Sequence, residues 1–334
     1  MNRVKIGIIG SGFGLYGLLP AFNSVPGCEV TCIFGEKNKR LINYCKKINL
    51  KKIYTDWHVM LNKEKLDAVA IAVPPNAQYE IAKEAISKGL HIFAEKPLAA
   101  TLNQASELLR LAKRKKIKHM IDFEFPEIDE WKKVKELLDR KKFGKLQQIC
   151  INWDFLSFDI KNQKSTWKTN VAEGGGALSF YFCHSLHYLE YFAGEISDIK
   201  SMLSYSPQSL NGGDVGVDTL IKFKNGAVGN AHLNCNARGL NRHQLVFIFK
   251  GATIILENKN SFTSNFTVKI FTDSGLAQLP VSLERSIKKG EDERVRVIEK
   301  VAARFVQAII QNKEPSPSFV DGVRVQQLIE KIRK

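Results

Sequence analysis

Short apolar runs alternate with helix-like stretches over the first third of this chain, and this alternation constrains its fold more than any other feature. Runs typical of buried strands cover residues 4–9, 29–34, 66–73, 91–94 and 119–122. One intervening helix is expected from about Ala77 and is stopped by Gly89. Parallel strands need crossover connections of this length, so the pattern predicts βαβ units and a parallel sheet with right-handed crossovers.

A second helix in this region has a recognisable start. Thr101-Leu-Asn-Gln104 matches a capping box, in which the two side chains satisfy each other's backbone N–H groups. We expect that helix to run to about Lys113.

The pattern changes near Phe123. Apolar β-rich segments follow at 149–153, 219–223, 245–249 and 267–271, and helices are expected at about 130–141, 177–192, 292–312 and 321–333. We therefore expect an α/β domain over residues 1–122. An α+β domain with a large, mostly antiparallel open sheet should follow over residues 123–334.

The composition is that of a globular protein, with 44% hydrophobic and 25% charged residues among 334. The first apolar run is too short for the core of a signal peptide, and no run reaches the 18 or so residues of a membrane helix. The six cysteines form no C-x-x-C pair. These observations favour a cytoplasmic protein with reduced thiols and without membrane association.

The formal net charge of +16 raises the question of nucleic-acid binding. However, the 50 basic residues are distributed along the chain, and the run Lys113-Arg-Lys-Lys stands at an expected helix C-terminus, where cations are favoured. We expect no nucleic-acid partner. A basic surface instead suits an anionic substrate or cofactor.

A glycine-rich turn, Gly10-Ser11-Gly12-Phe13-Gly14, joins the first strand to the first helix. Glycines at such a point permit a tight turn and let a pyrophosphate approach the helix N-terminus. In the usual G-x-G-x-x-G spacing the third glycine would stand at Leu15, so here it comes one residue early. In its βαβ context, the turn predicts dinucleotide binding.

The residue that normally selects the ribose lies at the end of the second strand. Gly35 stands where an acidic residue would accept the ribose 2′-hydroxyl, and Glu36 follows it. Lys37 or Arg40 would suit a 2′-phosphate, which Glu36 would repel unless it is turned away. Alternatively, these charges are simply solvated. The choice between NAD and NADP stays open.

Motifs along nearly the whole chain resemble the Gfo/Idh/MocA family, which includes glucose–fructose oxidoreductase and inositol dehydrogenase. The matching segments are Gly10-Ser-Gly-Phe-Gly with Leu19-Pro-Ala-Phe, Tyr54-Thr-Asp-Trp, Ala70-Ile-Ala-Val-Pro-Pro-Asn, Ala94-Glu-Lys-Pro-Leu, Gly144-Lys-Leu, Gly174-Gly-Gly-Ala-Leu with His184, and Pro317-Ser-Phe with Asp321-Gly. The resemblance implies an N-terminal Rossmann domain and hydride transfer on a sugar, polyol or nucleotide-linked sugar. It further implies that the second-domain sheet builds the substrate pocket and a homodimer or homotetramer.

Residue roles follow from the same resemblance. Lys96 matches the lysine that contacts both nicotinamide and substrate, and Pro74, Asn76 and Glu95 border the cofactor. A positioned ammonium stabilises the alkoxide that develops when an alcohol loses hydride. His184 matches the family histidine that takes or returns the hydroxyl proton, as suits a group that titrates near neutral pH.

The chain departs from the family pattern around that histidine. Phe180 and Phe182 stand where an aspartate and a glycine are usual, and His187 replaces an aspartate. Proton transfer is then left to Lys96 and His184, or the chain binds its cofactor without turnover, as a sensor or accessory subunit.

Two further side chains bear on this segment. Trp167 is a candidate for stacking on a sugar or on the nicotinamide, and His187 is a candidate substrate contact. Although His184 and His187 share a helix face, no carboxylate ligand is evident beside them, and we expect no metal.

Overall fold

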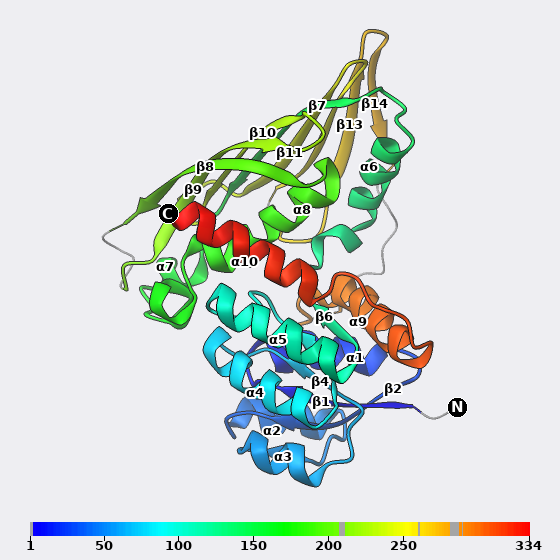
Figure 1. Ribbon diagram of the computed structural model, residues 1–334, viewed down its shortest axis with the longest axis vertical. Helices are drawn as coiled ribbons and strands as arrows, with labels where there is room; N and C mark the ends of the chain where they lie inside the picture. The colour runs from blue at the N-terminus through cyan, green and yellow to red at the C-terminus, as the bar shows by residue number, and fades with distance from the viewer. Residues whose placement is uncertain (1–2, 207–210, 260, 281–286, 289) are drawn as a thin grey trace. The chain divides into compact units, whose positions relative to one another are not determined.

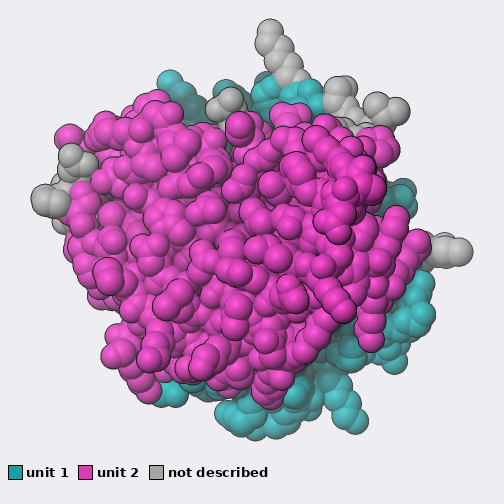
Figure 2. Space-filling model, turned by 90° about the horizontal axis from the view of Figure 1, so that it is seen from above, with its two compact units in different colours: residues 1–124, 286–326 teal, residues 125–285, 327–334 magenta. Residues whose placement is uncertain are grey.

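The structure is a computed structural model that describes residues 3–206, 211–259, 261–280, 287–288 and 290–334. The chain forms two compact units, coloured separately in Figure 2. The first comprises Met1–Glu124 and Ser286–Gln326, and the second Phe125–Arg285 and Gln327–Lys334. The sequence pattern assigned all of 123–334 to one domain, whereas residues 286–326 belong to the first unit.

The first unit contains a wholly parallel sheet with strand order β3-β2-β1-β4-β5-β6 (Figure 1). This is the doubly wound order of dinucleotide-binding folds. The strands are β1 (Val4–Ile9), β2 (Cys28–Phe34), β3 (Ile53–Tyr54), β4 (Ala68–Ile71), β5 (His91–Ala94) and β6 (His119–Ile121). Its central strands are apolar because both faces are covered. The predicted parallel sheet is confirmed.

Helices connect these strands in sequence. They are η1 (Gly14–Leu18), α1 (Leu19–Ser24), α2 (Lys39–Lys47), α3 (Trp57–Lys63), α4 (Pro75–Ser87) and α5 (Leu102–Lys115). Only half of the predicted capping box of α5 forms. Thr101 Oγ1 accepts the N–H of Gln104 over 3.3 Å, but the Gln104 side-chain oxygen accepts no hydrogen bond among the described residues.

Helix α9 (Val295–Ile310) explains why the late segment belongs to the first unit. Its apolar residues recur every three or four positions and form one buried face. Phe305 from this face packs edge-on against Phe22 of α1 and Phe93 of β5, with ring centres 6.3 and 5.7 Å apart. The segment therefore completes the core around β1 and α1. Helix α10 (Phe319–Arg333) begins in this unit and ends in the second.

The second unit is built on a sheet of order β14-β13-β12-β11-β7-β10-β9-β8. All neighbours are antiparallel except β7 and β10. The strands are β7 (Leu146–Asp154), β8 (Ile196–Tyr205), β9 (Asp214–Phe223), β10 (Val228–Asn234), β11 (Arg242–Phe249), β12 (Thr253–Lys259), β13 (Thr267–Thr272) and β14 (Gly275–Leu279). The predicted mostly antiparallel sheet is confirmed.

Burial alternates along these strands, as expected where one face of a sheet is covered. Helices lie along that face in Figure 1. The helical segments of this unit are η2 (Phe125–Glu127), α6 (Asp129–Asp139), α7 (Phe158–Lys161), η3 (Trp167–Thr169), η4 (Val171–Glu173), η5 (Leu178–Phe182) and α8 (Cys183–Ala193). Within the described residues, no helix combines the length and hydropathy needed to cross a bilayer.

Candidate active site

The site residues predicted in the first unit follow the carboxyl ends of neighbouring parallel strands. The glycine turn follows β1, Gly35 follows β2, Pro74 comes shortly after β4, and Glu95 and Lys96 follow β5. Because parallel strands end at the same edge of a sheet, the structure brings these segments to one edge. That edge is where open α/β sheets bind their ligands.

The glycine turn has the geometry that a pyrophosphate requires. Gly10 has φ of +129°, and a Cβ there would collide with the carbonyl oxygen of Ala72. A Cβ on Gly12 would meet nothing within 4 Å, so the backbone is bare and approachable at this position. The early Gly14 is in ordinary contact with Ile8 and Ile9. Close packing instead requires Gly17, whose missing side chain leaves room for the Phe13 ring.

Gly35 touches the glycine turn directly. A Cβ at this position would lie 2.5 Å from Cβ of Ser11, so no side chain fits where the usual ribose-binding acid would start. The N–H of Glu36 donates to Ser11 Oγ over 3.3 Å. Glu36 is therefore the first side chain beyond β2 available to a ribose, and it is exposed.

The predicted basic residues also lie at this edge. Lys37 is exposed just ahead of α2, whose N-terminus is capped by Asn38 through a 3.0 Å bond from the N–H of Leu41. The Arg40 guanidinium lies 5.0 Å from the ring centre of Tyr16 in η1. Glu36, Lys37 and Arg40 thus all follow the carboxyl end of β2, at the start of α2.

Buried Gln78 supports the segment that carries Lys96, and sequence reasoning missed it. It lies on α4, the helix that starts at Pro75 between the predicted residues Pro74 and Asn76. Its Nε2 donates to the carbonyl oxygens of Glu95, Pro97 and Leu98 over 2.6, 3.0 and 3.1 Å. One amide thus fixes the backbone on both sides of Lys96.

Two further acids accompany Glu95 and Lys96 at this edge. Asp122 and Glu124 follow β6, and their exposed fractions are only 1% and 4%. Burial, followed by the charges of Glu95 and Glu124, raises the pKa of Asp122 well above its usual range. Burial raises the pKa of Glu124 to about 7, with Lys96 opposing and Glu95 adding to the shift. Burial also raises the pKa of Glu95, although Lys96 and a hydrogen bond with Asp122 oppose it.

A distant arginine also reaches the glycine turn. Arg294, just before α9, is held by Asp292 through bonds of 2.8 and 2.7 Å. Its guanidinium lies over the Phe13 ring at 4.2 Å from the ring centre. Its charge also acts on Glu95 and Glu124. Nothing near residue 294 in the sequence indicated this role.

In the second unit, a glycine segment leads into the helix that carries His184. A Cβ on Gly176, which has φ of +93°, would collide with the carboxylate of Asp214. That buried carboxylate accepts the N–H of Leu178 over 2.6 Å at the start of η5. Arg333 Nη2 lies 3.6 Å from Asp214 Oδ1 and donates to the Gly175 carbonyl and to Ser179 Oγ.

His184 is only 2% exposed and lies among aromatic side chains. The Phe125 ring is 5.0 Å away, nearly perpendicular to it. Another buried histidine, His243, stacks on Trp153 at 4.4 Å and bonds to the Tyr188 hydroxyl over 2.9 Å. Burial lowers the pKa of His243 to about 3, so this ring is neutral.

The Phe180 ring contacts aromatic and cationic side chains. Its ring lies 5.2 Å from Trp167 and 4.6 Å from Tyr181, edge to face in both cases, and Lys168 Nζ lies 4.9 Å above it. The predicted Trp167 thus packs on the residue that replaces the usual aspartate. His187 is half-buried, one turn beyond His184 on α8.

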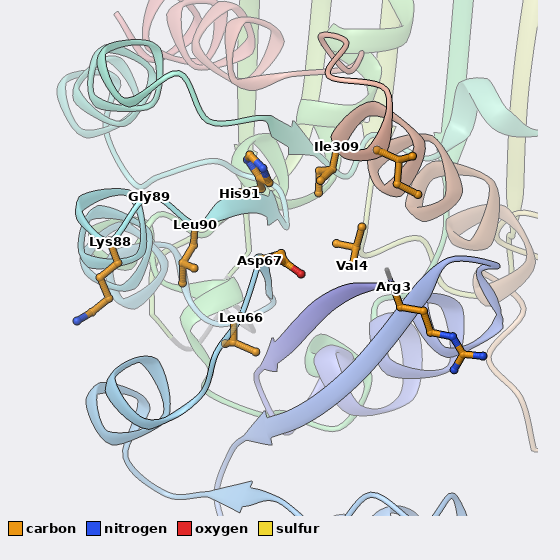
Figure 3. Close-up of a pocket in the computed structure, with 10 residues that line it drawn as sticks. Arg3, Val4, Leu66, Asp67, Lys88, Gly89, Leu90, His91 and Ile309 are labelled. Carbon is orange, nitrogen blue, oxygen red and sulfur yellow. The ribbon is translucent and has the colours of Figure 1, made fainter. Parts of the chain in front are cut away.

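A pocket lies at the opposite edge of the parallel sheet, near the starts of β1, β4 and β5 (Figure 3). It encloses about 470 Å³. In Figure 3 the side chains of Arg3 and Lys88 extend away from its centre. None of the predicted site residues lines it. Among the described residues, no group of three or more His, Cys, Asp or Glu side chains could hold a metal ion.

Two sequence models match the chain in succession. Residues 4–123 match the oxidoreductase family with an NAD-binding Rossmann fold, and residues 131–255 match the GFO/IDH/MocA C-terminal domain. The chain belongs to the Gfo/Idh/MocA family of oxidoreductases. The bare glycine turn and the Lys96 edge of the first unit fit the nicotinamide dinucleotide, NAD or NADP, that this family's Rossmann domain binds.

Two curated relatives extend over the full family architecture. Levoglucosan dehydrogenase of Pseudarthrobacter phenanthrenivorans is 27% identical, and the match covers 97% of this chain and 94% of that protein. An oxidoreductase of Synechocystis sp. is 26% identical over 98% of this chain and 92% of its own length.

A solved structure of levoglucosan dehydrogenase with NADH and L-sorbose matches this Gfo/Idh/MocA chain with a TM-score of 0.86. The match covers 100% of this chain and 96% of the other, at 23% identity. It demonstrates the shared fold.

Proposed function

We propose that this family member transfers hydride between NAD or NADP and a CH–OH group of a sugar, polyol or nucleotide-linked sugar. The observation that carries the proposal is the bare backbone at Gly12 on the same edge of one sheet as Lys96. The name of the levoglucosan-oxidising relative supports a sugar-type substrate. The basic composition suits an anionic substrate, such as a nucleotide-linked sugar, equally well.

Each group has a distinct task in this proposal. The glycine turn from Gly10 to Gly14 holds the pyrophosphate through backbone N–H groups. The bound nicotinamide supplies or accepts the hydride. Lys96 stabilises negative charge on the reacting oxygen, and His184 takes or returns its proton. Glu36, Lys37 and Arg40 contact the adenosine ribose, while Pro74, Asn76 and Glu95 border the cofactor.

The experiment pairs cofactor titration with a substrate panel. Intrinsic fluorescence would measure the affinity for NADH and NADPH. Absorbance of the reduced cofactor would then follow reactions with levoglucosan, other sugars, polyols and nucleotide-linked sugars. Lys96→Ala should abolish turnover, whereas Lys47→Ala at the far end of α2 should not. In the same assay, His184→Ala tests whether His184 of the second unit transfers the hydroxyl proton.

The contacts of Phe180 favour a second candidate, a cofactor-binding sensor or accessory subunit without turnover. An aromatic side chain packed on Trp167 cannot orient His184 as a carboxylate would. If the dinucleotide binds but no member of the panel changes the cofactor absorbance at any pH, the dehydrogenase proposal fails and this candidate replaces it.

The proposal includes location and assembly. The six cysteines are all free thiols, which supports the reducing cytoplasm, and we propose no nucleic-acid or membrane partner.

Met202 of β8 and Leu220 of β9 are 72% and 69% exposed on the second-unit sheet, which supports a homodimer or homotetramer. Light scattering after size exclusion would measure the assembly, and a monomer at micromolar concentration would contradict it.

A further inference from the structure

Three acids stand around Lys96 because of the strand register. Ala94 of β5 pairs with Ile121 of β6, and the N–H of Asp122 donates to the carbonyl of Ala94 over 2.9 Å. Glu95 and Asp122 are the next residues of these two adjacent parallel strands. Their side chains therefore start at neighbouring points of the edge that carries Lys96, and Glu124 follows two residues later.

The acids interact with each other as well as with Lys96. The carboxyl groups of Glu95 and Asp122 are hydrogen-bonded to each other. Such a bond requires one proton between two carboxyls. The pair holds this proton near neutral pH, because burial raises the pKa of both acids and the charges of Glu95 and Glu124 raise that of Asp122 further.

Glu124 differs from Asp122 in that it gains or loses its proton near neutral pH. Burial raises its pKa to about 7, the Lys96 ammonium opposes this shift, and Glu95 adds to it. The charge of Arg294, which is paired with Asp292, also acts on Glu124. All of these groups belong to the first unit.

Each member of the Glu95–Asp122 pair has one buried oxygen atom without a donor from another described residue. Glu95 Oε1 and Asp122 Oδ1 are buried and have no N–H or O–H donor from other residues in the described part of the chain, so the proton shared by the two carboxyls is the donor left to them. Buried polar atoms are normally paired, and leaving one unpaired costs free energy.

We propose that Glu124, with the hydrogen-bonded pair Asp122 and Glu95, forms a proton store for Lys96 during hydride transfer. The inference rests on the proposed dehydrogenase function. In this proposal the carboxylates that take part in proton transfer come from the first unit. The second unit has Phe180 where the family usually has an aspartate.

The proton balance is as follows for alcohol oxidation. The C–H bond breaks and its hydride reduces the oxidised nicotinamide dinucleotide. The O–H bond breaks and, in place of His184, which Phe180 leaves without an orienting carboxylate, Lys96 accepts the proton. At the same time the Lys96 ammonium gives a proton to the Glu124 carboxylate. The products are the carbonyl compound, the reduced dinucleotide and protonated Glu124, which then releases its proton to solvent. Carbonyl reduction runs the same steps in reverse.

The kinetic test compares Glu124→Gln and Asp122→Asn with Glu80→Gln, an exposed glutamate on α4. In oxidation, the wild-type kcat should rise with pH through a limb near neutrality as Glu124 ionises. Glu124→Gln should remove this limb and lower kcat by about a hundredfold, with KM and dinucleotide affinity nearly unchanged. The control should keep the wild-type profile. An unaltered pH profile in Glu124→Gln would overturn the proposal.

A second readout needs no turnover. Infrared titration of the wild-type protein should show a protonated carboxyl band that persists above pH 7 and disappears in Asp122→Asn. A second band should titrate near pH 7 and disappear in Glu124→Gln. Absence of both bands from the wild type overturns the proton store even if a variant fails to fold. If the bands are present but no substrate reacts, the dehydrogenase function fails instead.

Discussion

The Arg294 guanidinium lies over the ring of Phe13, 4.2 Å from its centre, and thereby ties the start of α9 to the dinucleotide turn. Asp292 holds the guanidinium through two bonds, while the absence of a side chain at Gly17 leaves space for the Phe13 ring. The conformation of a turn near the N-terminus thus depends on a residue near the C-terminus.

Removing that cation should weaken cofactor binding. Arg294→Ala loses a cation–π contact of about 1–2 kcal/mol and frees the turn, so the dissociation constant for NADH or NADPH should rise about tenfold. Arg294→Lys keeps the charge but loses the planar contact, and its effect should be intermediate. Fluorescence titration measures both, with the exposed Arg140→Ala as control. Unchanged affinity in a folded Arg294→Ala protein would refute the coupling.

Substitutions at Gln78 should destabilise the protein to different degrees. The loss depends on whether the new side chain offers the three carbonyl groups no polar atom or another acceptor. Gln78→Leu leaves buried acceptors without a donor, at about 1–3 kcal/mol for each bond lost. Gln78→Glu places an acceptor against acceptors, so it should be the more destabilising variant. Urea denaturation would measure the order, and Gln307→Ala on the exposed face of α9 should have little effect. Leu and Glu variants of equal stability would contradict the assigned role.

Glu36 should discriminate against the cofactor with a 2′-phosphate. Glu36→Gln removes a negative charge beside Ser11 and should improve the affinity for NADPH relative to NADH by several-fold at low salt. The ratio of the two dissociation constants is the measurement. As a control, Glu29→Gln at the start of β2 should leave the ratio unchanged. An unchanged ratio in Glu36→Gln would contradict the prediction and would show that the Glu36 side chain lies away from the ribose.

The start of the His184 helix should depend on Asp214. Asp214→Ala leaves the buried N–H of Leu178 without its acceptor and should lower the free energy of unfolding by about 1–3 kcal/mol. Asp214→Asn retains an oxygen there and should cost less. Chemical denaturation would separate them, with Asp139→Ala, which removes a surface ion pair, as the small-effect control. Equal losses for Ala and Asn would show that the charge matters more than the bond.

Glu124 should make the stability depend on pH. Its folded pKa of about 7 exceeds its ordinary value of 4.5, so the folded state binds the proton more tightly. The contribution of Glu124 to the free energy of unfolding should therefore be largest below about pH 4.5, and it should fall as the pH rises through about 7. Each pKa unit corresponds to about 1.4 kcal/mol. Glu124→Gln should flatten this part of the curve, and a wild-type curve without the decline would contradict the raised pKa.

The sequence predicted those elements whose pattern is local and strongly apolar. Strands β1, β4 and β5 are buried runs and were identified from hydropathy alone. Helix α2 is rich in lysine and β3 has only two residues, so neither gave a comparable signal. Strands β8, β10, β12 and β14 were not identified; most side chains of β8 and β14 are exposed.

The residues of the candidate site likewise fall into those with a local sequence pattern and those without one. The glycine turn and Glu95-Lys96-Pro97 are contiguous motifs whose residue types indicate their chemistry. The contributions of Gln78, Arg294 and Asp214 come from contacts between segments far apart in sequence, and a single glutamine, arginine or aspartate has no local pattern. Only the packing of α4, α9 and β9 reveals them.

The membership of α9 in the first unit also bears on how the protein is made. Phe22 and Phe93 lack Phe305 as a packing partner until residue 305 has been synthesised. On the ribosome, the nucleotide-binding half therefore cannot finish folding first, although its sheet emerges first. The sheet of the intervening second unit can form while the core of the earlier half is still incomplete, so apolar surface of that half stays exposed during translation.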